Sequence, residues 1–82
     1  MPRKIRLLSG KDMVKILESY GFVLKRNVGS HARLTLEKDQ RSFHVTIPLH
    51  SEMKKGTLRS VINELEKCVD SEILEKDFYT EK

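Results

Sequence analysis

Residues 31–48, HARLTLEKDQRSFHVTIP, contain two runs in which apolar and polar side chains alternate. The apolar positions are Ala32, Leu34 and Leu36 in residues 31–37 and Phe43, Val45 and Ile47 in residues 42–47. A period of two is typical of a β-strand with one buried face. Residues 38–40 are expected to form the turn, and Pro48 ends the second strand because proline cannot donate to a ladder. The stretch therefore predicts an antiparallel hairpin, whose opposite face carries His31, Arg33, His44 and Thr46.

Upstream of this hairpin, the spacing predicts a helix over residues 10–20. Met13, Ile16, Leu17 and Tyr20 recur at the intervals of one helical face. Ser9 and Asp12 have the spacing of a capping box, and Gly21 suits the left-handed residue that ends a helix. Residues 22–28 predict a further strand, in which Phe22, Leu24 and Val28 share one parity and Arg26 does not fit it. Gly29 and Ser30 break this strand.

Downstream of Pro48, residues 49–56 are expected to form a loop that contains Lys54 and Lys55. Thr57 is a good N-cap for a second helix over residues 58–68. The apolar stripe of this helix is Leu58, Val61, Ile62, Leu65 and Cys68. Asp70 or Ser71 is expected to cap a last short helix that carries Ile73, Leu74 and Phe78, and residues 79–82 are expected to fray.

These elements predict an α+β fold of order α-β-β-β-α. Two amphipathic helices and one apolar sheet face make a two-layer sandwich, with three antiparallel strands under the helices and an open polar face beyond. The 82 residues suffice for a single domain, which we expect to span residues 1–82, with a core at about 7–66 and an acidic C-terminal extension at 67–82.

Charge is distributed unevenly along the chain. Residues 1–60 carry thirteen Lys or Arg and five Asp or Glu, a net charge of +8, whereas residues 61–82 carry three and seven, a net charge of −4. A basic body of this kind favours a polyanionic partner such as nucleic acid, although a basic solvated surface is the simpler interpretation. No apolar run is long enough to span a membrane, and we expect a cytoplasmic protein. The single cysteine, Cys68, is expected to be a buried, inert thiol.

Gly29-Ser30-His31 is the candidate reactive centre, because it places an imidazole at a strand start beside a turn of small residues. Imidazole titrates near neutrality and suits general acid–base chemistry. The bland interpretation is a histidine that hydrogen-bonds its own loop. His44 is a candidate second catalytic group or simply a polar-face residue, and His50 is expected to hydrogen-bond loop backbone. A metal site made of His31, His44 and His50 is conceivable, but no carboxylate spacing supports it.

Five motifs in order resemble the HicA (YcfA-like) toxin family of toxin–antitoxin systems. They are Ser9-Gly10-Lys11, Tyr20-Gly21-Phe22, Gly29-Ser30-His31, Pro48-Leu49-His50 and Gly56-Thr57-Leu58-Arg59. The resemblance covers about residues 7–66. It implies a fold like that of double-stranded-RNA-binding domains, and an endoribonuclease that cleaves messenger RNA without needing a ribosome. We expect no cofactor. It also implies that His31 is the essential histidine and that a HicB-type antitoxin covers the active face.

Cleavage of RNA without a metal uses the ribose 2′-hydroxyl as nucleophile, so a base and nearby cations are required. His31 is the candidate base, Arg33 the candidate phosphate contact on the same face, and the Gly29-Ser30 backbone a second anion contact. Flanking phosphates are assigned to Lys25, Arg26, Lys54 and Lys55. The alternative is a non-catalytic RNA-binding module, or an inactive toxin remnant acting through protein contacts. The acidic extension could provide a homodimer contact or an added antitoxin contact.

Overall fold

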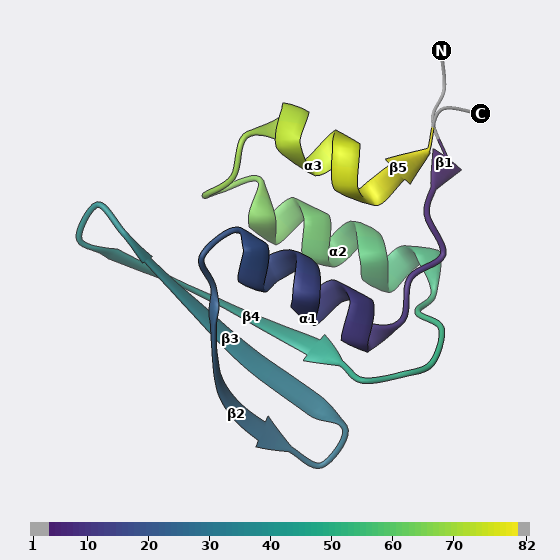
Figure 1. Cartoon of the computed structure of the whole chain (residues 1–82), viewed down its shortest axis with the longest axis horizontal. Helices are drawn as coiled ribbons and strands as arrows, with labels where there is room; N and C mark the ends of the chain where they lie inside the picture. The colour runs from purple at the N-terminus through teal and green to yellow at the C-terminus, as the bar shows by residue number, and fades with distance from the viewer. Residues whose placement is uncertain (1–3, 81–82) are drawn as a thin grey trace.

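The computed structural model describes residues 4–80 of the chain. In chain order the elements are β1 (Lys4–Ile5), α1 (Gly10–Ser19), β2 (Val23–Val28), β3 (His31–Lys38), β4 (Arg41–Pro48), α2 (Lys55–Leu65), α3 (Ser71–Phe78) and β5 (Tyr79–Thr80). Strands β2, β3 and β4 form one antiparallel sheet in that spatial order, while β1 and β5 pair with each other (Figure 1). The expected α-β-β-β-α order and the α+β class are confirmed, and the structure resembles a double-stranded-RNA-binding domain. No helix within residues 4–80 is long and apolar enough to cross a bilayer.

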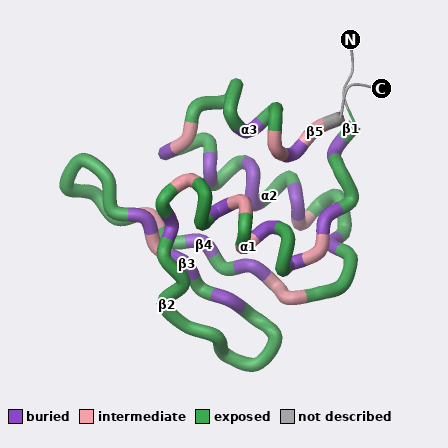
Figure 2. The backbone as a smooth tube through the Cα atoms, in the orientation of Figure 1, coloured by how far each residue is buried: buried purple, intermediate pink, exposed green. Residues whose placement is uncertain are grey.

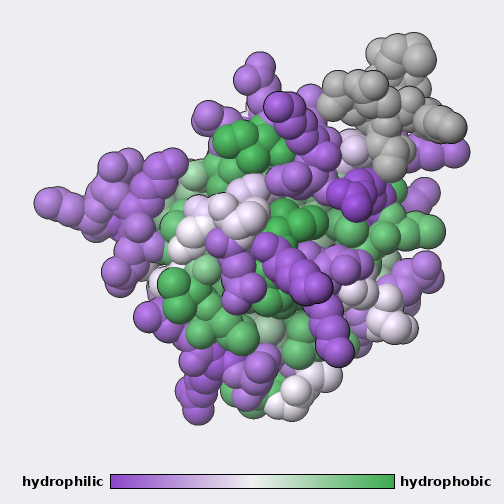
Figure 3. Space-filling model, in the orientation of Figure 1, coloured by the Kyte–Doolittle hydropathy of each residue, from purple (hydrophilic) through white to green (hydrophobic). Residues whose placement is uncertain are grey.

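The sheet has one buried face and one open face, as the alternation predicts. The register pairs Leu34 with Val45 and Ala32 with Ile47, and all four side chains are buried. Helices α1 and α2 lie over this face, so the buried segments follow the boundary between the two layers (Figures 1 and 2). The turn between β3 and β4 is made by Asp39 and Gln40, which both have left-handed backbones with φ of 53° and 62°. The tip of this hairpin extends beyond the helices and forms a hydrophilic lobe (Figure 3).

A β-bulge at Lys25 explains why Arg26 did not fit the predicted strand pattern. Leu24 pairs with Leu34 on the helix side, but the next pair is Arg26 with Arg33, so Lys25 is an extra residue on β2. A single extra residue turns every following side chain to the other face. Val28 therefore lies on the open face beside His31, and not on the face of Leu24 as the sequence suggested. Every residue of β2 is exposed.

Helix α1 begins and ends as expected. The backbone N–H of Asp12 donates to Oγ of Ser9 at 3.1 Å, and the backbone N–H of Ser9 donates to the Asp12 carboxylate at 3.2 Å, which completes the capping box. The hydrogen bond from the Ser9 backbone N–H is the main cause that lowers the pKa of the Asp12 carboxyl, and the Ser9 side chain lowers it further. Gly21 follows the helix with φ of 106°, a conformation that favours glycine.

Helix α2 starts and ends earlier than predicted. Its N-cap is Lys54, so Thr57 lies inside the first turn instead of capping it. The cause is tertiary, because Met53 is buried and its N–H donates to the carbonyl of Leu8 at 3.1 Å, which fixes the chain just before the helix. The helix ends at Leu65, where Lys67 and Cys68 switch to tighter bonds from residue i to residue i−3. Cys68 thus lies in a turn and not on a helix, although it is buried as expected.

The C-terminal segment is part of the packed structure. Leu74 and Phe78 of α3 are buried in the same apolar cluster as the residues of the sheet and of α1 and α2, whereas Ile73 remains exposed. Residues 79–80 do not fray as predicted, because β5 pairs with β1 and the Arg6 N–H donates to the Phe78 carbonyl at 2.8 Å. The rest of the expected frayed end, residues 81–82, lies outside the described residues.

Candidate active site

The candidate site is built on the two-residue turn between β2 and β3. Strand β2 ends at Val28 and β3 begins at His31, and these two residues are the last cross-strand pair of the hairpin. Gly29 has φ of 60°, and no atom lies within 4 Å of the position where its Cβ would be, so the backbone conformation is the reason for a glycine. Both Ser30 and His31 are exposed. The turn therefore holds the imidazole at the edge of the open face.

The backbone of this turn is fixed by a segment that follows β4, residues 48–50, which we call the 48–50 strap. The Leu49 N–H donates to the carbonyl of Ser30 at 2.6 Å. At its other end, the carbonyl of His50 accepts the N–H of Gly10, the first residue of α1, at 2.8 Å. Three motifs that are far apart in the sequence therefore meet immediately behind His31.

Two arginines lie next to His31 on the open face. Arg33 follows two residues later on β3, and the register places Arg26 directly opposite it on β2. Both are exposed, and neither forms an ion pair with an acidic residue within residues 4–80. Like charges directly opposite each other on adjacent strands are destabilising. The pair is therefore unfavourable for the fold by itself and suited to an anion that lies across both guanidinium groups.

The His31 ring is available for chemistry. It is exposed and forms no hydrogen bond with any other part of residues 4–80. This arrangement differs from the bland interpretation, in which the ring bonds its own loop. The placement of His31, Arg33, His44 and Thr46 on the open face follows the sequence prediction.

The other two histidines lie elsewhere. His44 pairs with Thr35 across the strands, and its Nδ1 lies 3.0 Å from the Thr35 hydroxyl. Thr35 is four residues from His31 along β3, which corresponds to about 13 Å at the rise of a β-strand. The ring of His50 is exposed, and only its backbone carbonyl contributes to the strap. Within residues 4–80, no group of three or more His, Cys, Asp or Glu side chains could hold a metal ion.

The structure divides the remaining basic candidates between two places. Lys25 is the bulged residue of β2 and lies beside the arginine pair, whereas Lys54 and Lys55 lie at the N-terminus of α2 in the helix layer. The N-termini of α1 and α2, the end of β4 and the β2–β3 turn all lie at one end of the molecule (Figure 1). Lys54 and Lys55 therefore flank the site and do not form part of its centre.

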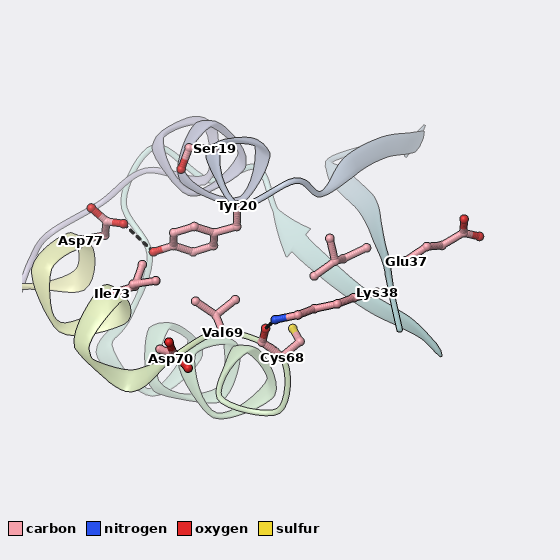
Figure 4. Close-up of a pocket in the computed structure, with 10 residues that line it drawn as sticks. Ser19, Tyr20, Glu37, Lys38, Cys68, Val69, Asp70, Ile73 and Asp77 are labelled. Atoms are coloured by element: carbon pink, nitrogen blue, oxygen red, sulfur yellow. Dashed lines mark hydrogen bonds between the residues drawn. The ribbon is translucent and has the colours of Figure 1, made fainter. Parts of the chain in front are cut away.

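A groove of about 630 Å³ lies between the end of α1, the end of β3, the α2–α3 turn and α3. Its features are a hydrogen bond of 2.6 Å from the Tyr20 hydroxyl to the Asp77 carboxylate and one of 3.1 Å from Lys38 Nζ to the Cys68 carbonyl (Figure 4). Burial is the main cause that raises the pKa of the Tyr20 hydroxyl, and burial likewise raises the pKa of the Cys68 thiol. Both shifts favour the protonated forms of these two groups.

Sequence reasoning missed two contributors to the site. Val28 was assigned to the core face, yet its side chain is 53% exposed beside His31. Gly10 was treated only as part of a helix start, yet its N–H donates a hydrogen bond to the carbonyl of His50 in the 48–50 strap. A glycine at the first position of a helix, where alanine has the higher propensity, was the one signal that could have drawn attention to it.

The fold and the site together define a small basic α+β protein with an exposed histidine beside two arginines. Residues 10–66 match the family model of the HicA toxins of bacterial toxin–antitoxin systems, and the chain belongs to this family. Membership implies an antitoxin partner. Comparisons with curated proteins and with solved structures give no match. The matched region contains Gly10, His31 and the 48–50 strap but leaves out β1, α3 and β5.

Proposed function

We propose that this toxin is an endoribonuclease that cleaves messenger RNA without a metal ion, with His31 as the general base. The observation that carries the proposal is the position of the His31 ring, which is exposed and without a hydrogen-bond partner in residues 4–80, on the same face as Arg33 and Arg26. Family membership supports the coarser activity, because HicA proteins are toxins of the ribonuclease type.

The proposed reaction uses the substrate's own ribose as nucleophile. An imidazole nitrogen of His31 takes the proton of the 2′-hydroxyl, the 2′ oxygen bonds to the adjacent phosphorus, and the bond from phosphorus to the 5′ oxygen of the next nucleotide breaks. The products are a 2′,3′-cyclic phosphate and a 5′-hydroxyl, whose proton comes from the imidazolium or from water. Arg33 and backbone amides of the Gly29-Ser30 turn stabilise the charge that builds on the non-bridging oxygens.

Product chemistry tests this proposal directly. In excess chelator, the purified protein is expected to cut RNA and leave only 2′,3′-cyclic phosphate and 5′-hydroxyl ends, detected by end-labelling with enzymes specific for each end. A substrate with 2′-deoxyribose at the cleaved position is expected to bind but stay intact. Cleavage that stops in chelator, or products with 5′-phosphate ends, would replace the proposed mechanism with a metal-dependent one.

The arginine pair is proposed to bind the scissile phosphate and its neighbour. Replacement of Arg26 by glutamine is expected to weaken RNA binding and to lower the slope of log affinity against log salt by about one unit. The same change removes a like-charge pair, so the free energy of unfolding is expected to stay level or to rise by a few tenths of a kcal/mol, roughly. RNA affinity is therefore expected to fall without any loss of stability.

Lys76→Gln is the matched control for Arg26→Gln, because Lys76 is an exposed cation on α3, outside the three-stranded sheet that carries the arginine pair. It removes the same formal charge and is expected to leave the salt slope close to that of the wild type. Salt titrations of RNA affinity and urea melts of both variants measure the two effects. Equal changes in slope for the two variants would mean that net charge, and not the arginine pair, governs binding.

We further propose that the antitoxin is of the HicB type and covers the open face. The exposed Val28 beside His31 supports this, because an apolar side chain next to a reactive group offers a protein partner a contact that RNA phosphates do not use. A non-catalytic RNA-binding module is the second candidate function, which the arginine pair favours by itself. The two candidates differ in one result, since only the enzyme cuts RNA in a purified reaction.

A further inference from the structure

Gly10 lies closer to another backbone segment than any side chain would permit. A Cβ built on Gly10 would overlap the carbonyl oxygen of Pro48 and lie 2.6 Å from Cα of Leu49. Only Gly21 and Gly29 among the described glycines have positive φ, so the backbone conformation of Gly10 does not require glycine. Alanine also has a higher helix propensity than glycine, so propensity gives no reason for a glycine at this position. Close approach to the 48–50 strap is therefore the physical reason for the glycine.

The strap transmits this close contact to the candidate site. The N–H of Gly10 holds the carbonyl of His50, and one residue earlier the N–H of Leu49 holds the carbonyl of Ser30. The Ser30 carbonyl belongs to the peptide group that joins Ser30 to His31, so the bond from Leu49 fixes the orientation of that peptide. Pro48 also lies directly opposite His31 in the β3–β4 register. A displacement of the strap would therefore displace the Ser30–His31 peptide group and, with it, the imidazole of His31.

We propose that Gly10 is a positioning residue for His31, acting through the 48–50 strap and the Leu49–Ser30 hydrogen bond. This inference rests on the proposed function. A methyl group at position 10 displaces the strap, releases or misaligns the Ser30 carbonyl and moves the imidazole relative to the 2′-hydroxyl. Displacements of about 1 Å can lower an enzymatic rate by about 10²-fold. The arginine pair lies on β2 and β3, outside this chain of contacts, so RNA affinity is expected to stay close to that of the wild type.

Gly10→Ala tests the inference, with Gly56→Ala as its matched control. Gly56 lies in the first turn of α2, and no atom lies within 4 Å of its Cβ position, so the control adds the same methyl group without a clash. Gly10→Ala is expected to lower kcat 10- to 100-fold, an estimate of about the size that such misplacement produces, with KM within roughly twofold of the wild type. Gly56→Ala is expected to match the wild type in both. An unchanged kcat for Gly10→Ala would overturn the inference. So would a loss of kcat that is accompanied by a comparable fold-loss in RNA affinity and by a lower melting temperature, because that pattern indicates a general structural defect.

Two spectroscopic measurements test the coupling without any catalysis. In Gly10→Ala, the Leu49 amide is expected to exchange with solvent faster by about tenfold or more, because its acceptor is displaced, and the NMR signals of the His31 ring are expected to move. Neither change is expected in Gly56→Ala. If the wild-type protein does not cut RNA, the proposed function fails while these two readouts still decide the coupling. Unchanged Leu49 exchange and unchanged His31 signals in Gly10→Ala would overturn it.

A second variant covers the case in which Gly10→Ala fails to fold. The 82-residue chain is short enough for chemical synthesis with the α-hydroxy acid analogue of leucine at position 49, which removes the N–H donor and leaves Gly10 in place. This ester variant is expected to show the same loss of kcat at unchanged KM. The same substitution at Leu65, within α2, removes one backbone donor elsewhere and serves as the control. Wild-type kcat in the Leu49 ester would contradict the proposed link.

Discussion

Replacement of His31 by alanine is expected to reduce the rate of RNA cleavage by about 10²–10⁴-fold, the contribution of a well-placed general base. RNA affinity and thermal stability are expected to stay close to those of the wild type. The ring is exposed and forms no hydrogen bond within residues 4–80, so the fold loses nothing when it is removed. Single-turnover cleavage in chelator measures the rate, and binding to the 2′-deoxy substrate measures the affinity.

His44→Ala is the control that the structure provides for this experiment. His44 is an exposed histidine on the same sheet face, but its ring is engaged with Thr35 and lies about four residues further along the sheet from His31. Its removal is expected to change the cleavage rate by no more than about tenfold, below the range for a general base. A loss in His44→Ala as large as that in His31→Ala would point to a pair of catalytic histidines. A wild-type rate in His31→Ala would exclude the proposed role of that residue.

Phe78→Ala is expected to lower the free energy of unfolding by about 3–5 kcal/mol, the usual cost of deleting a buried aromatic side chain. Phe78 has 0% exposure and belongs to the same apolar cluster as the residues under the sheet. For a small domain, this loss is a large fraction of the total stability of about 5–15 kcal/mol. Urea melts followed by circular dichroism measure it.

The same helix supplies the control for Phe78→Ala. Ile73 is 44% exposed on α3, so Ile73→Ala creates little cavity and is expected to cost about 1 kcal/mol or less. The large loss for Phe78 would show that α3 is required for folding, although the family match ends at residue 66. A chain that stops at Glu66 and unfolds at the wild-type urea concentration would show instead that residues 67–80 are an independent addition. We propose that residues 1–82 form one folding unit.

The sheet and α1 could be predicted because their signals are local. Alternation in residues 31–37 and 42–47 fixes which side chains face the helices. A shift of a strand's register by one residue would turn all of these side chains to the open face. The Ser9–Asp12 capping box is complete within four residues. The placement of His31 on the open face follows from the same alternation, so the centre of the candidate site was within reach of sequence reasoning.

The features that could not be predicted depend on contacts between distant segments. The only local signal of the bulge at Lys25 is the misfit of Arg26, and this misfit does not locate the bulge because every residue of β2 is exposed and no buried face fixes its parity. The start of α2 is set by the Met53–Leu8 bond, and no sequence window contains both residues. Strands β1 and β5 have two residues each, too few for any periodicity.

The support of the site escaped prediction for the same reason. Gly10, Ser30 and Leu49 belong to three motifs, and only the folded chain shows that two backbone hydrogen bonds join them. The groove beside Tyr20 likewise arises where α1, β3 and the α2–α3 turn meet. Sequence patterns describe single elements, whereas the backbone that supports the candidate site is positioned by contacts between elements.

The most direct test of the role of His31 is chemical rescue of the His31→Ala variant by free imidazole. The site is open to solvent, so imidazole can occupy the vacated position and take the 2′-hydroxyl proton. We expect added imidazole to restore part of the lost cleavage in His31→Ala, with a dependence on its concentration that saturates, and to leave Arg33→Ala unchanged. Imidazole that accelerates both variants equally, or a His31→Ala variant that needs no rescue because it already cuts RNA at the wild-type rate, would contradict the account.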